Sequence, residues 1–186
     1  MAAELSTSHF QLFDLPRSFD VDMVQLDSRY RELQRTVHPD RFANASDQER
    51  RISMQQTTQI NEGYQVLKDP LRRGRYLLEL RGYRFADGQQ TNNDVAFLME
   101  QMELRESLGE VREADDAFAA LGKVMDRIGG DNDRLIAVLH RQFAAGEPDS
   151  NECSDCIAET LTKMQFFHEL QEEAMELEVT LEDEIS

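Results

Sequence analysis

The sequence predicts an all-α protein made of two helical units. Apolar residues recur at helical three- and four-residue spacing over long stretches, and no segment shows the alternation typical of a half-buried strand. The charge changes abruptly along the chain, because residues 1–80 carry a net charge of −1 and residues 81–186 carry −16. We expect a first domain over residues 1–81, a polar, glycine-containing linker over 82–93 and a second domain over 94–186.

The first unit is expected to hold an antiparallel helical hairpin followed by a short helix. Asp20 is a suitable N-cap for the first helix of this hairpin. Pro39 should end that helix, because proline lacks an N–H and disfavours the α conformation of the residue before it. One apolar stripe follows the helix at steps of four and three residues: Leu26, Tyr30, Leu33 and Val37.

The second helix of the hairpin should begin near Ser46 or Asp47, where SDQE supplies a cap and acidic residues for the first turn. It should end before Pro70, and a short arginine-rich helix follows over residues 71–80. The connection between the two long helices, roughly eight residues, suits an antiparallel pair.

The second unit should be a bundle of three antiparallel helices, because the connections between its helical segments are short. The expected segments are 94–109, 113–145 and 150–184. Gly129 and Gly130 interrupt the middle segment, which predicts a kink or a short break at that point.

The tripeptide His38–Pro39–Asp40 leaves three interpretations open. A histidine and an aspartate can act as an acid–base pair, but catalysis also needs a nucleophile, a metal or a bound water in a shaped pocket. Proline and aspartate also build simple turns. In the third interpretation the turn is an exposed recognition site. Arg31 and Arg35, four residues apart, would then add positive charge on one face of the preceding helix.

The segment DVAFLMEQMELRESLGEV carries apolar side chains on two opposite faces of a predicted helix. One face consists of Phe97, Leu104, Leu108 and Val111. The other consists of Val95, Leu98, Met99 and Met102, interleaved with Glu103, Glu106 and Glu110. A core needs only one such stripe, so the second is either buried by another helix or exposed as a partner site. The pattern alone favours neither, although methionines suit adaptable binding surfaces.

Phe166 lies on the opposite side of the last predicted helix from Ile157, which would free it for the same surface. Leu170 and Leu177 share its side and would instead draw it into a core.

Cys153 and Cys156 form a CxxC pair, with His168 further along the same helix. A zinc site usually needs four ligands with a second spaced pair, and a thioredoxin-like motif needs a βαβ context. We expect packing or partial exposure for these thiols, with no metal and no cofactor.

Composition narrows the classes of protein further. No apolar run is long enough to span a bilayer, and the N-terminus does not resemble a signal peptide. With two cysteines, these features favour a cytoplasmic protein in a reducing compartment. The net charge of −17 argues against nucleic acid as a partner, because phosphate binding needs basic stripes.

Two stretches of the chain resemble a known family. HPD after a helix carrying YRELQRTV, followed by INEGYQVLKDPLRRGRYLLEL, resembles a J-domain over roughly residues 8–80. In that family the pattern INxAYxVLxDPxxRxxYL marks the third helix and the turn after it. The second half, with DVAFLMEQMELRE, is similar to the scaffold-binding domain of the HscB-type J-domain co-chaperones of bacterial iron–sulfur cluster assembly.

The resemblance implies a co-chaperone with two protein partners and no catalytic residue of its own. It would stimulate a DnaK-like ATPase chaperone of the HscA type and deliver an iron–sulfur scaffold protein of the IscU type to it. Carried over residue by residue, the chaperone-binding set is His38, Pro39, Asp40, Arg31, Arg35 and Arg41. The scaffold-binding set is Leu98, Met99, Met102, Glu103, Glu106, Glu110 and Phe166. The expected protein is a monomer of the bacterial cytoplasm, with no membrane partner.

This chain departs from the family pattern at a few positions. Met102 stands where the family often has leucine, and Arg41 replaces the lysine common after HPD. Gly63 replaces an alanine, which by helix propensity should weaken its helix by about 1 kcal/mol. Cys153 and Cys156 are outside the family pattern. The alternative functions are a general J-protein that holds unfolded clients and, least supported, an enzyme.

Overall fold

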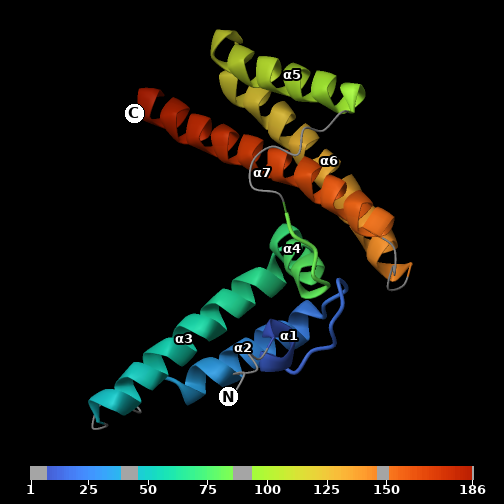
Figure 1. Cartoon of the computed structure of the whole chain (residues 1–186). Coiled ribbons are helices and arrows are strands. Elements are labelled where there is room, and N and C mark those ends of the chain that lie inside the picture. Colours follow the sequence, from blue (N-terminus) through green and yellow to red (C-terminus); the bar gives the residue numbers. More distant parts are fainter. Residues whose placement is uncertain (1–7, 39–45, 86–93, 146–150, 186) are drawn as a thin grey trace. The chain divides into compact units, whose positions relative to one another are not determined.

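The computed structural model describes residues 8–38, 46–85, 94–145 and 151–185. The described part of the chain is helical and contains no strand, which confirms the predicted all-α class. The chain divides into two compact units, Met1–Gly82 and Tyr83–Ser186 (Figure 1). No helix in the described ranges is long and apolar enough to cross a membrane.

The first unit is built around an antiparallel pair of helices, α2 and α3. Its elements are α1 (His9–Leu12), α2 (Met23–Thr36), α3 (Asp47–Lys68) and α4 (Pro70–Leu80) (Figure 1). Helix α3 begins at a capping box, in which Ser46 and Glu49 bind each other's backbone N–H. Helix α4 begins at Pro70, one residue before the predicted start, with Asp69 as its N-cap.

The N-cap predicted for the first helix of the hairpin was wrong. Asp22, and not Asp20, caps α2, and its Oδ1 accepts from the N–H groups of Val24 and Gln25 at 2.9 and 3.0 Å. The two aspartates are equally good caps by residue type, and only the backbone conformation distinguishes them. The four-residue helix α1, capped by Ser8, was not predicted at all.

Helices α2 and α3 are joined through stacked tyrosines and a buried apolar core. The rings of Tyr30 and Tyr64 lie 3.9 Å apart, and the Tyr64 hydroxyl donates to Asp27 at 2.8 Å. The core of this unit includes Phe10, Phe13, Phe19, Leu26, Ile60, Leu67, Leu71, Leu77 and Leu78.

Helix α1 packs closely against α3 at Gly63. A Cβ atom at this glycine would lie 3.0 Å from both Nδ1 of His9 and Cε2 of Phe13. The His9 ring also lies tilted against Tyr76 of α4 with ring centroids 4.6 Å apart, and the Tyr76 hydroxyl accepts from the His9 backbone N–H at 3.0 Å. Burial lowers the pKa of His9, although Glu62 opposes this shift. Gly63 therefore lets α1 approach α3 closely, which the family pattern did not indicate.

The second unit is dominated by a long antiparallel hairpin of α6 and α7, against which α5 packs (Figure 1). The elements are α5 (Val95–Gly109), the 3₁₀ helix η2 (Glu110–Glu113), α6 (Ala117–Ala144) and α7 (Asn151–Ile185). Helix α6 continues through Gly129 and Gly130, so of the predicted kink or short break the break was wrong. Flanking core residues, among them Ile128, hold the helix across the two glycines.

One continuous core joins the three helices of this unit. It includes Phe97 and Leu104 from α5, Ile128 from α6, and Phe167 and Leu170 from α7. Val111 in η2 closes the same core at the end of α5. This arrangement fixes which face of α5 is turned inward.

Candidate protein-binding sites

In the first unit, the end of α2 presents His38 to solvent. Val37, buried, caps the helix, and His38 follows it as an exposed residue. The hydroxyl of Ser53, on α3, donates to the carbonyl oxygen of Val37 at 2.9 Å. Ser53 is 6% exposed, so this bond ties the residue before His38 to the hairpin. Sequence reasoning missed Ser53, because nothing local marks a serine as a long-range partner.

The rest of the tripeptide lies outside the described residues. Pro39, Asp40 and Arg41 belong to the range that the structure does not describe. Their roles stay predictions from the sequence.

The exposed face of α2 is basic. Arg31 and Arg35 are both exposed, and Arg31 donates from Nε to the carbonyl oxygen of Asp27 at 3.2 Å. Arg29 is instead engaged within the unit, with Asp14 at 2.8 Å and Glu32 at 3.1 Å. Arg31 and Arg35 are thus exposed side chains on the helix that leads to His38.

In the second unit, α5 exposes the second apolar stripe seen in the sequence. Phe97 and Leu104 are 5% and 0% exposed and form the inward face. On the outward face the exposed fractions are 68% for Val95, 43% for Leu98, 59% for Met99 and 73% for Met102. Glu103, Glu106 and Glu110 are exposed beside them. Of the two interpretations left open, the structure supports the exposed patch. We call this surface the α5 face; it consists of Val95, Leu98, Met99, Met102, Glu103, Glu106 and Glu110.

Phe166 is not part of the exposed surface, so its predicted exposure was wrong. It is 7% exposed and packs edge-on against Phe97 and Phe167, with ring centroids 5.7 and 5.4 Å apart. Leu170 and Ala174, on the same side of α7, are fully buried and draw this side into the core. The guanidinium of Arg105 lies 5.5 Å from the Phe166 ring. Phe166 therefore packs against the inward face of α5.

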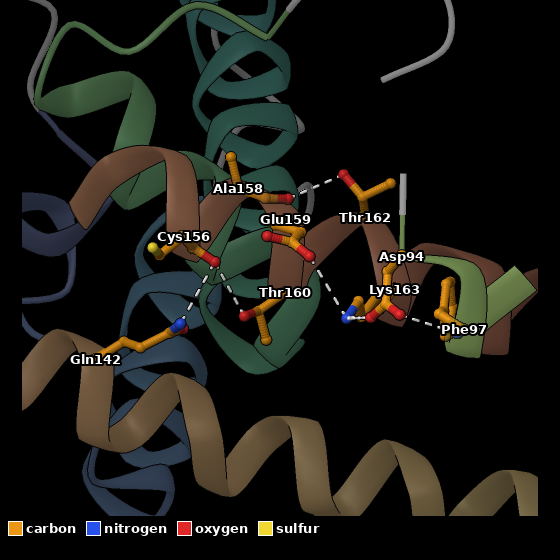
Figure 2. A network of polar contacts seen from close by, with 9 residues as sticks. All are labelled: Asp94, Phe97, Gln142, Cys156, Ala158, Glu159, Thr160, Thr162 and Lys163. Atoms are coloured by element: carbon orange, nitrogen blue, oxygen red, sulfur yellow. Dashed lines mark hydrogen bonds and ion pairs between the residues drawn. The ribbon is translucent and has the colours of Figure 1, made fainter. Parts of the chain in front are cut away.

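A polar network attaches the start of α5 to α7 (Figure 2). Asp94 caps α5 by accepting from the N–H of Phe97 at 3.2 Å, and its other oxygen accepts from Lys163 Nζ at 2.7 Å. The same ammonium lies 3.5 Å from Glu159 and 5.3 Å from the centroid of the Phe97 ring. One lysine thus contacts the cap, the first inward aromatic ring and its own helix.

The electrostatics of this network favour the charged pair. The hydrogen bond from Lys163, together with that from the Phe97 N–H, lowers the pKa of Asp94. Burial alone would lower the pKa of Lys163, but the hydrogen bond and charge of Asp94 and the charge of Glu159 outweigh it and raise the pKa. The sequence gave no sign that Asp94 and Lys163 form a pair, because 69 positions separate them.

An open pocket of about 630 Å³ borders the α5 face. Met99 and Glu103 line it from α5, and Lys163 and Phe167 line it from α7. Arg127 of α6 donates to Glu103 at 3.3 Å across its mouth, so one carboxylate of the α5 face already has a partner within the chain. The lining mixes both signs of charge with apolar side chains, which is typical of a protein interface rather than of a cofactor site.

Among the described residues, the cysteine pair has no neighbours that would complete a metal site. Cys153 is half-buried and Cys156 is exposed, and both are free thiols. Within the described ranges, no group of three or more His, Cys, Asp or Glu residues could hold a metal ion. Cys156 does take part in the polar network at the start of α7, but through its carbonyl oxygen, which accepts from Gln142 and Thr160 (Figure 2).

These two sites define a class of protein. One unit displays a histidine after a basic helix, and the other displays an apolar patch rimmed by acids, each on a rigid helical support. Such surfaces bind other proteins. The fold is that of an all-α protein of two helical units, each with an exposed surface that is a candidate protein-binding site.

Comparisons with known proteins identify the family. Residues 93–175 match the family model described as the HSCB C-terminal oligomerisation domain. A co-chaperone protein HscB homolog from Shewanella oneidensis is 42% identical over 176 residues, which cover 95% of this chain and 99% of the relative. The chain belongs to the HscB family of co-chaperones, and its role lies in iron–sulfur cluster assembly.

Solved structures agree with this assignment. The chaperone HscB from Vibrio cholerae has a TM-score of 0.79 and 39% identity, covering 94% of this chain and 99% of its own. The human co-chaperone protein HscB has a TM-score of 0.83 and 31% identity, covering 97% of this chain and 86% of its own. Both likenesses extend over both helical units.

Proposed function

We propose that this co-chaperone binds a DnaK-like ATPase chaperone of the HscA type with its first unit. With its second unit it binds an iron–sulfur scaffold protein of the IscU type. The exposed α5 face carries this proposal, because it is a large apolar patch with an acidic rim on an otherwise well-packed unit. The protein would work in the bacterial cytoplasm, because its curated relatives are bacterial. The monomeric state stays a prediction from the sequence, and the matching family model is described as an oligomerisation domain.

The first unit would act on the chaperone through the turn after α2. His38, Pro39 and Asp40 would contact the chaperone, and Arg31, Arg35 and Arg41 would steer the unit towards an acidic surface. The chaperone would carry out the phosphoryl chemistry, and this protein would supply no catalytic group. Its effect would be a shift between the states of the ATPase, limited by its difference in affinity for them.

The second unit would hold the scaffold through the α5 face. Leu98, Met99 and Met102 would form the apolar centre, with Val95 beside them. Glu103, Glu106 and Glu110 would form the charged rim. The net charge of −16 over residues 81–186 suits a partner surface that carries lysines and arginines. Phe166 would contribute indirectly, because it fixes the inward face of α5.

The magnitude of the apolar contribution follows from the exposed fractions. Fully burying a leucine or methionine side chain contributes about 1.5–3 kcal/mol. Scaled by the exposed 43% of Leu98 and 59% of Met99, the pair contributes about 1.5–3 kcal/mol together. Removing both should raise the dissociation constant of the scaffold about 10- to 100-fold.

Calorimetry with purified scaffold tests the proposal, and the chain offers a matched control. Leu98→Ala with Met99→Ala truncates two apolar side chains of the α5 face, whereas Met175→Ala with Val179→Ala truncates two side chains of α7 with exposed fractions of 44% and 57%. Only the first double variant should lose affinity. Equal losses in the two variants would remove the basis for placing the scaffold on α5. Competition by an unfolded peptide at equal affinity would favour a general client-holding function instead.

A further inference from the structure

The α5 face contains two solvent-exposed methionines on one side of a single helix. Met99 and Met102 are 59% and 73% exposed, and residues three apart on a helix are neighbours. Met164, in the core of the same unit, is only 2% exposed. An oxidant in solution therefore reaches the sulfurs of the α5 face but not the sulfur that packs inside the unit.

The chemistry available to these side chains is two-electron oxidation. A thioether sulfur attacks one oxygen of a peroxide such as hydrogen peroxide, and the O–O bond breaks. The hydroxide that departs takes the proton from the oxygen now bound to sulfur and leaves as water. The sulfur is oxidised to a sulfoxide and the peroxide is reduced. Methionine sulfoxide is polar and chiral, disrupts methionine-rich interfaces and is reduced back by methionine sulfoxide reductases.

We propose that Met99 and Met102 form a reversible oxidation site, at which peroxides switch off scaffold binding. The inference rests on the proposed function of the α5 face. Each sulfoxide would place a polar S=O group at the apolar centre of the interface, where an unsatisfied polar group is unfavourable. Position 102 matters most, because its methionine is the most exposed of the four apolar side chains.

The fold confines the effect to scaffold binding. Because Met164 is buried and Met125 is only partly exposed, the core of the second unit keeps its packing while the α5 face is modified. The first unit does carry a strongly exposed methionine, Met54 of α3 at 71%, but this residue is not among those proposed to contact the chaperone. An oxidised protein should thus still stimulate the chaperone, yet it should no longer deliver the scaffold.

The test uses the full chain with Cys153→Ser and Cys156→Ser, so that exposed thiols do not compete for the oxidant. The protein is treated with hydrogen peroxide, the peroxide is removed, and sulfoxides are located by peptide mass spectrometry. Scaffold affinity is then measured by calorimetry before and after treatment. Oxidation should lower the affinity about tenfold or more. A methionine sulfoxide reductase should restore it.

Two variants make the result specific. With Met99→Leu and Met102→Leu, the ratio of affinities before and after peroxide should stay near one, whatever the starting affinity of that variant. With Met175→Leu, which removes an exposed methionine outside the α5 face, the loss should match the parent. The inference is overturned by full affinity in protein oxidised at both positions, or by an equal loss in the leucine variant. If Leu98→Ala with Met99→Ala leaves scaffold affinity unchanged, the proposed function itself has failed.

Discussion

Replacing Gly63 by alanine separates what helix propensity predicts from what packing dictates. Gly63 is buried in the interior of α3, and its Cα faces the rings of His9 and Phe13 on α1. A glycine-to-alanine change in a helix interior normally stabilises it by about 1 kcal/mol. Here the new Cβ would lie 3.0 Å from a ring atom of each neighbour, which is shorter than the distance of about 3.5–4.0 Å at which two carbon atoms pack best.

The packing cost should exceed the gain in propensity. Phe13 is 0% exposed, so its ring has no open space behind it, and the half-buried His9 ring lies against Tyr76 at 4.6 Å. Overpacking of this kind typically costs about 1–3 kcal/mol. After the propensity gain is subtracted, Gly63→Ala should destabilise the first unit by about 1 kcal/mol.

Hydrogen exchange measured by mass spectrometry gives the required readout, because the slowest amides of each unit report its unfolding separately. Gly122→Ala in α6 is the matched control, since a Cβ there meets no heavy atom within 4 Å. It should stabilise the second unit by about 1 kcal/mol. Both substitutions replace a glycine within a helix by alanine, yet their effects on the stability of the two units should have opposite signs.

Stabilisation of α3 by Gly63→Ala, equal to that of α6 by Gly122→Ala, would refute this reasoning. The His9→Ala background supplies a second check. It removes one of the two close contacts, so the penalty of Gly63→Ala should shrink there by about 0.5 kcal/mol or more. An unchanged penalty would mean that the His9 ring is not responsible.

Two further substitutions test the support of the α5 face. Lys163→Met removes the contact to the Asp94 cap, so amide exchange over residues 95–109 should accelerate and scaffold affinity should fall severalfold. Lys163→Arg should restore most of that affinity, whereas failure of Lys163→Met to change either quantity would show that α5 needs no such anchor. Phe166→Ala should destabilise the second unit by about 3–5 kcal/mol, because a buried aromatic ring is lost. Denaturant unfolding of this variant at wild-type stability would contradict the buried placement.

Local signals in the sequence predicted much of the helical framework. The capping sequence before Asp47 and the proline at position 70 fixed the ends of α3 and the start of α4. Each of these boundaries depends on residues within a few positions of one another. The two-faced pattern of α5 was equally visible, because a helical wheel needs no tertiary information.

What the sequence left undetermined depends on contacts between distant residues. The burial of Phe166 follows from Phe97 packing against it from α5. Gly63 looked like a weakened helix position until α1, a helix too short to predict, placed two rings against it. Lys163 and Ser53 gave no local signal, since their partners Asp94 and Val37 lie elsewhere in the chain. Tertiary packing decided each of these cases.

The central claim is that two surfaces on two units bind two different proteins. It is tested most directly by measuring chaperone ATPase stimulation without scaffold, together with scaffold affinity, on three folded preparations: wild type, His38→Gln, and Leu98→Ala with Met99→Ala. We predict that His38→Gln abolishes stimulation and keeps the wild-type scaffold affinity. The double variant should lose scaffold affinity about 10- to 100-fold and keep wild-type stimulation. Loss of both activities in either folded variant would contradict the account.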